Sequence, residues 1–199
     1  MRKVLAIIPV LVLAMACQKQ PEPLQLEQVT GELESKLDVN WTDLPTNQDI
    51  TTTSPVGGEH FAPISTEDFG VNSETLVYDP AVTGLYYDVQ NLTGLSEIGQ
   101  LEMTISVVST NGFIERLTTV TLNNVENTTE NNGARSKIPI FTADDTGDVN
   151  LNALVAMNQS IILGRIVFQI DLVGRNVHLK NPEDFDIVFS YDLQGNIEQ

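Results

Sequence analysis

The sequence predicts an all-β protein, built as an antiparallel β-sandwich with one short helix near residues 150–158. Several segments alternate apolar and polar residues with a period of two, which is typical of strands that bury one face. Only one segment has the spacing of an amphipathic helix. Gly, Pro and Asn residues, which favour turns, separate the alternating segments.

The first expected strand covers residues 33–41. Its apolar positions fall on one face, and they are Leu33, Leu37, Val39 and Trp41. Charged and polar residues at 34, 36, 38 and 40 fall on the other face. This pattern predicts a strand with one side in the core and one side in water.

No periodicity is present over residues 42–73, where Pro45, Pro55, Gly57, Gly58 and Pro63 interrupt the chain. We expect a long irregular connection here, with room for one short edge strand. A connection of this length is unusual inside a compact domain. It therefore either carries function or contains an element that the pattern conceals.

The rest of the chain is rich in strand patterns. The expected strands are 75–79, 85–90, 101–107, 113–122, 135–141, 164–172 and 185–193. In the last strand, Asp186, Ser190 and Asp192 fall on the polar face. Asn111-Gly112 predicts a two-residue type I′ hairpin, because both residues tolerate a positive φ. Residues 123–133, rich in Asn, Glu and Thr, are expected to form an exposed loop.

One segment has helical spacing, with Leu151, Leu154, Val155 and Asn158 on one side. Asp148 or Asn150 could cap this helix. Seven to nine strands of this kind favour a sandwich that is immunoglobulin-like in the loose sense. The Cys-Trp-Cys signature of true immunoglobulin domains is absent, so Trp41 is expected to be an ordinary core residue.

The N-terminus has the features of an export signal. Basic Arg2 and Lys3 precede an unbroken apolar run from Val4 to Ala16, which is too short to cross a bilayer as a helix of about 20 residues. The stretch Leu13-Ala14-Met15-Ala16-Cys17 resembles the lipobox of bacterial lipoproteins. The resemblance implies cleavage before Cys17, a diacylglyceryl group on its sulfur, and acylation of the new amine by a chain such as palmitate.

The domain boundaries follow from this interpretation. Residues 1–16 would be the signal peptide, 17–23 the acylated N-terminus and a polar, Pro-bearing tether, and 24–199 a single β-sandwich domain. Two or three acyl chains bind a bilayer firmly. Gln18 after the cysteine resembles the outer-membrane address of enteric lipoproteins. Because Cys17 is the only cysteine, this chain forms no internal disulfide.

The charge excludes one class of partner. Asp and Glu number 27 against 10 Lys and Arg, for a net charge of −17. A surface this acidic repels phosphate backbones, so we expect no nucleic-acid partner. It also disfavours docking on anionic headgroups by charge, which leaves the lipid on Cys17 as the membrane attachment. The acidity is consistent with solubility or with cation binding.

Catalytic motifs are missing from the sequence. The two histidines, His60 and His178, are too few for a usual zinc site. Gly94-Leu95-Ser96-Glu97-Ile98-Gly99 is one residue too long for the serine elbow of hydrolases. We therefore expect no enzyme activity and no catalytic residues.

One polar stretch has the composition of a calcium loop. It spans residues 144–150 and carries Asp144, Asp145, Asp148 and Asn150 around a glycine. Calcium prefers such oxygen ligands, and the stretch resembles the start of the calcium loops of dockerin modules. The alternative is a polar loop in which Asp148 caps the helix. No other cofactor is expected.

Together these features predict a membrane-anchored envelope lipoprotein, in the outer membrane, with a non-enzymatic binding or structural module. Residues 42–73 and 123–133 would present loops to an envelope protein or a glycan. The alternatives are a calcium-stabilised adhesion module and an envelope hydrolase, which needs a pocket with converging acids and perturbed pKa values. A lipid carrier would need a large apolar cavity.

Overall fold

The computed structural model describes residues 25–41, 43, 46, 49–50, 56–92, 97–109, 111–125, 137–161, 165–180 and 184–198. The expected signal peptide, Cys17 and the tether lie outside the described residues. So do most of the expected 123–133 loop and part of the Gly94–Gly99 stretch.

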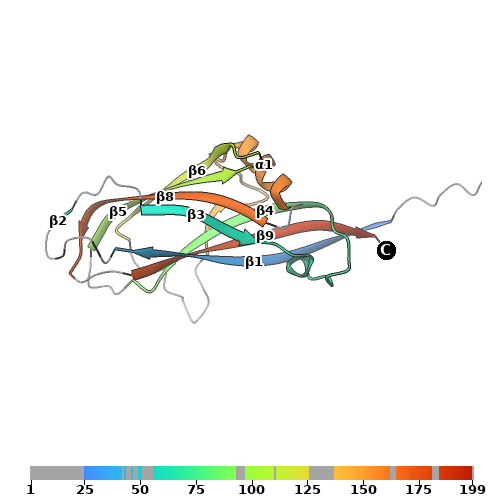
Figure 1. Ribbon diagram of the computed structural model, residues 1–199, viewed down its shortest axis with the longest axis horizontal. Coiled ribbons are helices and arrows are strands. Elements are labelled where there is room, and N and C mark those ends of the chain that lie inside the picture. Colours follow the sequence, from blue (N-terminus) through green and yellow to red (C-terminus); the bar gives the residue numbers. More distant parts are fainter. Residues whose placement is uncertain are drawn as a thin grey trace, which may run out of the picture.

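Two antiparallel sheets make up the fold and confirm the predicted β-sandwich (Figure 1). The four-stranded sheet has the order β1 (Leu26–Asn40), β9 (Asp184–Glu198), β4 (Tyr78–Gln90) and β7 (Ile138–Phe141). The second sheet has the order β2 (Asp49–Ile50), β8 (Arg165–His178), β5 (Glu97–Val108) and β6 (Ile114–Asn123), and β3 (Val56–Pro63) also pairs with β8. The helix α1 (Leu151–Ile161) lies beside β6, and η1 (Thr66–Phe69) is a short 3-10 turn.

The core lies between the sheets, and β1 contributes to it as the alternation predicts. Val39 and Trp41 are buried, whereas Glu34, Lys36 and Asp38 are exposed. Trp41 packs edge-on against Phe185, with ring centroids 5.4 Å apart, so it is a core residue as expected. Between the sheets, the space around Leu85, Ile105, Phe168, Ile170, Phe189 and Tyr191 has a free volume of about 0 Å³. This part of the core therefore holds no cavity for a carried lipid.

The prediction of an irregular connection over residues 42–73 is wrong for part of its length. β3 pairs with β8 from Val56 opposite Leu172 to Pro63 opposite Arg165, so the edge strand is longer than expected. Gly57, Gly58 and Pro63 conceal it in the sequence, yet an edge strand tolerates both residue types. η1 follows and packs on β1 at Gly31, where an added Cβ would lie 1.6 Å from the Asp68 backbone oxygen.

Two further expectations need correction. The strand expected at 75–79 begins only at Tyr78 and continues as β4, because residues 72–75 form a turn closed by Thr75 N–H and Asn72 O. The β5–β6 turn has three residues between Ser109 and Phe113, not two, and Gly112 takes the positive φ of 83°. A three-residue loop of this kind places one residue in the left-handed region.

The predicted helix is confirmed as α1, but the side predicted from its spacing is wrong. Leu151 and Val155 are exposed, and the buried residues are Ala153, Met157, Ser160 and Ile161. The cap of α1 is Asn150, whose Oδ1 accepts a hydrogen bond from the Asn152 backbone N–H at 2.9 Å. The last strand differs from its prediction, because Asp186, Val188 and Ser190 on its polar face are also buried. β9 lies between β1 and β4, and side chains on both neighbours flank it.

Candidate functional site

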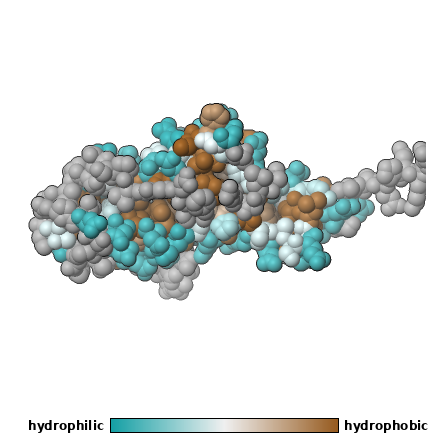
Figure 2. Space-filling model, in the orientation of Figure 1, coloured by the Kyte–Doolittle hydropathy of each residue, from teal (hydrophilic) through white to brown (hydrophobic). Residues whose placement is uncertain are grey.

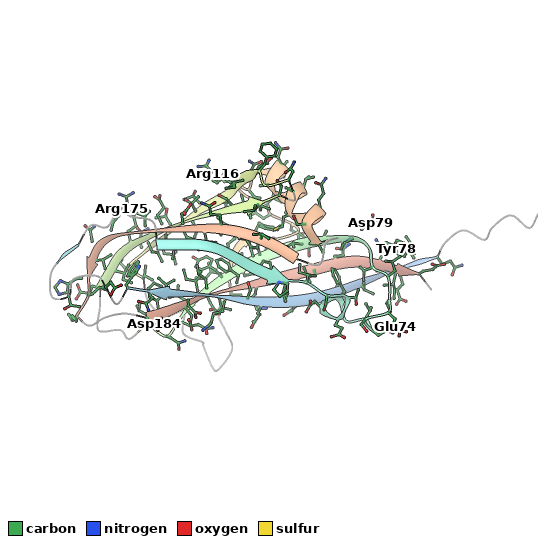
Figure 3. The ribbon with its side chains drawn as sticks, in the orientation of Figure 1. Glu74, Tyr78, Asp79, Arg116, Arg175 and Asp184 are labelled. Carbon is green, nitrogen blue, oxygen red and sulfur yellow. The ribbon has the colours of Figure 1, made fainter. Side chains whose placement is uncertain are left out.

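The outer face of the four-stranded sheet is rich in carboxylates. Antiparallel register places Glu32, Glu34, Lys36 and Asp38 of β1 beside the even-numbered residues of β9, from Asp184 to Asp192. We call this surface the acidic face. Hydrophilic residues cover its end around β1 and β9, where Asp184 lies (Figures 2 and 3).

A polar cleft opens at the end of the acidic face where β1 finishes and β9 begins. Its volume is about 500 Å³. We call it the distal cleft, and its lining is entirely polar: Lys36, Asp38, Asn40, Asn91, Asp184 and Asp186. Three elements contribute these residues, namely β1, the start of β9 and the segment that follows β4.

An ion-pair network organises the distal cleft. Lys36 Nζ lies 2.6 Å from Asp38 Oδ1 and 3.2 Å from Asp186 Oδ1. Asn91, which has a left-handed φ of 63°, donates from Nδ2 to Asp186 Oδ2 at 2.5 Å. Asp38 and Asp186 lie directly opposite each other in the sheet, a position where like charges repel. Lys36 offsets that repulsion by contacting both.

The hydrogen bonds in the distal cleft favour the charged forms of Lys36 and Asp38. The hydrogen bonds that Lys36 donates to Asp38 and, to a smaller extent, to Asp186 raise the pKa of Lys36, despite an opposing effect of burial. The hydrogen bond from Lys36, followed by one with Asp186, lowers the pKa of Asp38. Both groups therefore stay charged at neutral pH. A general acid in a glycosidase needs a carboxyl whose pKa is raised, and the shift at Asp38 has the opposite sign.

The predicted calcium residues are exposed in the loop before α1. Asp145 Oδ1 accepts a hydrogen bond from the Gly147 backbone N–H at 2.9 Å, and Asn150 caps the helix. Asp148 and Asn150 also border a small cleft of about 230 Å³ beside Arg116. Among the described residues, no three His, Cys, Asp or Glu side chains gather in a way that could hold a metal. Calcium binding by Asp144, Asp145, Asp148 and Asn150 stays a prediction.

The two histidines lie far apart. His60 of β3 is opposite Phe168 of β8, whereas His178 is the last residue of β8. Ten positions along a strand correspond to about 33 Å. His60 and His178 therefore do not share a site.

The distal cleft was not predicted from the sequence. Polar residues at 36, 38 and 40 and at 184 and 186 are visible as the outward faces of two strands. Their meeting depends on the register that sets Asp38 opposite Asp186, with 147 residues of chain between them. Nothing in the sequence around Asn91 indicates that this residue lines the cleft.

The fold and the cleft define a class: a two-sheet antiparallel β-sandwich with an acidic outer face. No family model matches the chain, and no curated protein sequence matches it. Among the described residues, no helix is long and apolar enough to span a membrane.

Solved structures give weak similarities. A Desmodium yellow mottle tymovirus structure is 8% identical with a TM-score of 0.35, over 100% of this chain and 91% of that chain. The decameric BFDV capsid protein is 9% identical with a TM-score of 0.35, over 86% and 99%. An infectious bursal disease virus Gt strain structure is 13% identical with a TM-score of 0.25, over 89% and 34%. Scores this low carry no argument about this protein.

Proposed function

We propose that this protein is a lipid-anchored lipoprotein of the bacterial envelope whose β-sandwich binds a partner and catalyses no reaction. The lipobox-like sequence ending at Cys17 supports the anchor. The acidic face and the distal cleft support recognition of a polar envelope ligand, a protein or a glycan. The lowered pKa of Asp38 gives no support to a general acid at that position.

One geometric observation carries the proposal. β1 begins at Leu26, shortly after the proposed tether, and ends at Asn40 in the distal cleft. Its 15 residues run along the long axis of the molecule (Figure 1). At about 3.3 Å per residue the two ends are about 45 Å apart. Leu26, the strand residue nearest the proposed anchor, and the cleft are therefore at opposite ends of the domain, so a molecule anchored at Cys17 would present the cleft away from the bilayer.

The anchor is tested by Cys17→Ser in the full-length protein. We expect the variant to move from the membrane fraction to the aqueous fraction, because no acyl chain remains to hold an acidic domain on the bilayer. Gln18→Ser is the matched control and should stay with the membranes. A Cys17→Ser protein that sediments with membranes like the parent would contradict the anchor.

Recognition is tested by photo-cross-linking in intact cells. A photoreactive residue at Asp184, in the distal cleft, should give a discrete adduct with an envelope component. The same residue at Glu74, an exposed position near the anchored end, should not give that adduct. Identical patterns from both positions would reject the cleft as the binding surface.

A further inference from the structure

β6 is an edge strand, and its second half lacks the usual protection of edges. Natural sheets protect edge strands by charge, by proline or by shortness. β7 has four residues and contains Pro139, and β1 carries a charge at 32, 34, 36 and 38. β6 has ten residues, and no charged residue or proline occurs from Leu117 to Val125.

Only the first half of β6 is covered among the described residues. The Asn150 backbone N–H donates to Leu117 O at 2.9 Å from the outer side of the strand. Beside it, a small cleft is lined by Arg116, Thr118 and Thr119 of β6 and by Asp148 and Asn150 of the loop before α1. Backbone groups alternate in direction along a ladder. Because Leu117 O points away from β5, the N–H and C=O groups of Thr119, Thr121 and Asn123 also point away from β5, toward the open edge.

Residues 119–123 can pair with the same residues of a second copy. An antiparallel pairing centred on Thr121 places Thr121 opposite Thr121 of a second copy, and Thr119 opposite Asn123 of that copy. The outward N–H and C=O groups of one copy then form hydrogen bonds with those of the other. On the core side, the half-buried Val120 of each copy would contact Leu122 of the other. No charge faces a like charge, although each chain carries −17 overall.

We propose that β6 is a self-association surface, and that two copies pair antiparallel through residues 119–123 to join their five-stranded sheets into one. Four of the exposed large apolar residues lie on the adjoining hairpin and α1, and they are Phe113, Ile114, Leu151 and Val155. A two-fold contact is self-complementary, which is the commonest arrangement of protein dimers.

The two-fold axis sets the direction of the pair. Rotation about an axis midway between the two Thr121 residues, perpendicular to the sheet, reverses the long axis of the second copy. The two Leu26 ends would then point in opposite directions. This consequence rests on the proposed function: lipid-anchored copies paired in this way would belong to two facing membranes.

The test uses the mature chain with Cys17→Ser, so that its result does not depend on the lipid. Sedimentation equilibrium should show a monomer–dimer equilibrium that strengthens as salt is added, because salt screens repulsion between two acidic copies. Association that weakens with salt would indicate opposite charges at the contact and would overturn the proposal. A monomer at every concentration would also overturn it.

A charge exchange at the axis tests the register. Thr121→Lys and Thr121→Glu each place like charges opposite each other, and each should weaken the dimer about fivefold. A mixture of the two variants should recover the association as a heterodimer. Thr30→Lys, at an exposed threonine on β1, is the matched control and should associate like the parent. Unchanged association of either Thr121 variant, no recovery in the mixture, or loss in the control would refute the pairing.

Discussion

At the scale of single residues, Ser35 and Tyr191 form a polar contact inside the sandwich. The Tyr191 hydroxyl lies 2.9 Å from Ser35 Oγ, and its ring stacks on Phe168. Burial raises the pKa of Tyr191, while the Ser35 hydrogen bond lowers it by less. The hydroxyl therefore stays neutral and needs its partner, because an unsatisfied buried hydroxyl is costly.

Ser35→Ala should lower the free energy of unfolding by about 1–3 kcal/mol, because it removes that partner from the buried Tyr191 hydroxyl. Urea denaturation measures the change. The double variant Ser35→Ala/Tyr191→Phe is the control, since removing both hydroxyls leaves no orphaned group. A double variant that loses the full sum of the two single changes would show that the hydroxyls do not act as a pair.

Lys36 sets the protonation of Asp38. Lys36→Gln should raise the pKa of the Asp38 carboxyl toward its ordinary value of 3.8, because the hydrogen bond that lowers it is removed. An NMR titration of the carboxyl carbon measures this. A lowered pKa adds stability above the unfolded value, and that stability is lost as the pH falls through the folded value. The parent should therefore lose more stability than the variant below about pH 4. An unchanged Asp38 pKa would contradict the network.

At the scale of elements, Gly31 determines how closely η1 packs on β1. Gly31→Ala would bring a Cβ within 1.6 Å of the Asp68 backbone oxygen, so η1 must move away. We expect a loss of about 2–4 kcal/mol in the free energy of unfolding, the range of severe core changes. Gly112→Ala is the control. Its Cβ meets nothing within 4 Å, and its positive φ should cost only about 1–2 kcal/mol. If Gly31→Ala and Gly112→Ala lower the free energy of unfolding equally, η1 moves away from β1 at no measurable cost.

The loop before α1 has two interpretations, a calcium site and a polar loop that caps the helix, and a variant of the Asn150 cap helps to separate them. Asn150→Ala should cost about 1 kcal/mol through the lost hydrogen bond to the Asn152 N–H, with or without calcium. The calcium hypothesis predicts in addition that calcium raises the melting temperature of the parent, because it binds only the native state. Asp145→Ala should remove that increase. Superimposable calorimetric curves in calcium and in a chelator would eliminate the calcium site.

Elements with strong alternation were predictable, and elements that break it were not. β1, β5, β8 and β9 follow from their apolar spacing, which reports burial on one face. For α1 the spacing indicated a helix but not its buried face, because Leu151 and Val155 are exposed. β3 was concealed by Gly57, Gly58 and Pro63, because the residues tolerated at a sheet edge are those typical of loops. The buried polar face of β9 was missed because burial there depends on its central place between β1 and β4.

At the scale of the whole molecule, the net charge of −17 opposes compaction, and the acidic face concentrates part of that charge. Added sodium chloride should therefore raise the melting temperature by screening self-repulsion. Choline chloride at the same ionic strength is the control for specific sodium binding and should act equally. A melting temperature that falls with either salt would show that ion pairs such as Lys36–Asp38 outweigh the repulsion.

The composition predicted this overall electrostatic character, but the location of the candidate site required the fold. The distal cleft exists because β1 and β9 pair over their whole length, which brings Asp38 and Asp186 together from distant parts of the chain. Single-strand periodicity indicates which side of a strand faces water. It contains no information on the partner strand or on the register.

The same β1–β9 pairing sets Leu26 opposite Glu198, so the first residue of β1 and the last residue of β9 lie on one side of the domain. A fluorescent protein or affinity tag fused after Gln199 would then emerge on the same side as the proposed lipid anchor. Such a fusion would crowd the proposed tether and leave Asp184 accessible. Reporters meant for the opposite end of the domain should instead be placed next to Asn40 or Asp184.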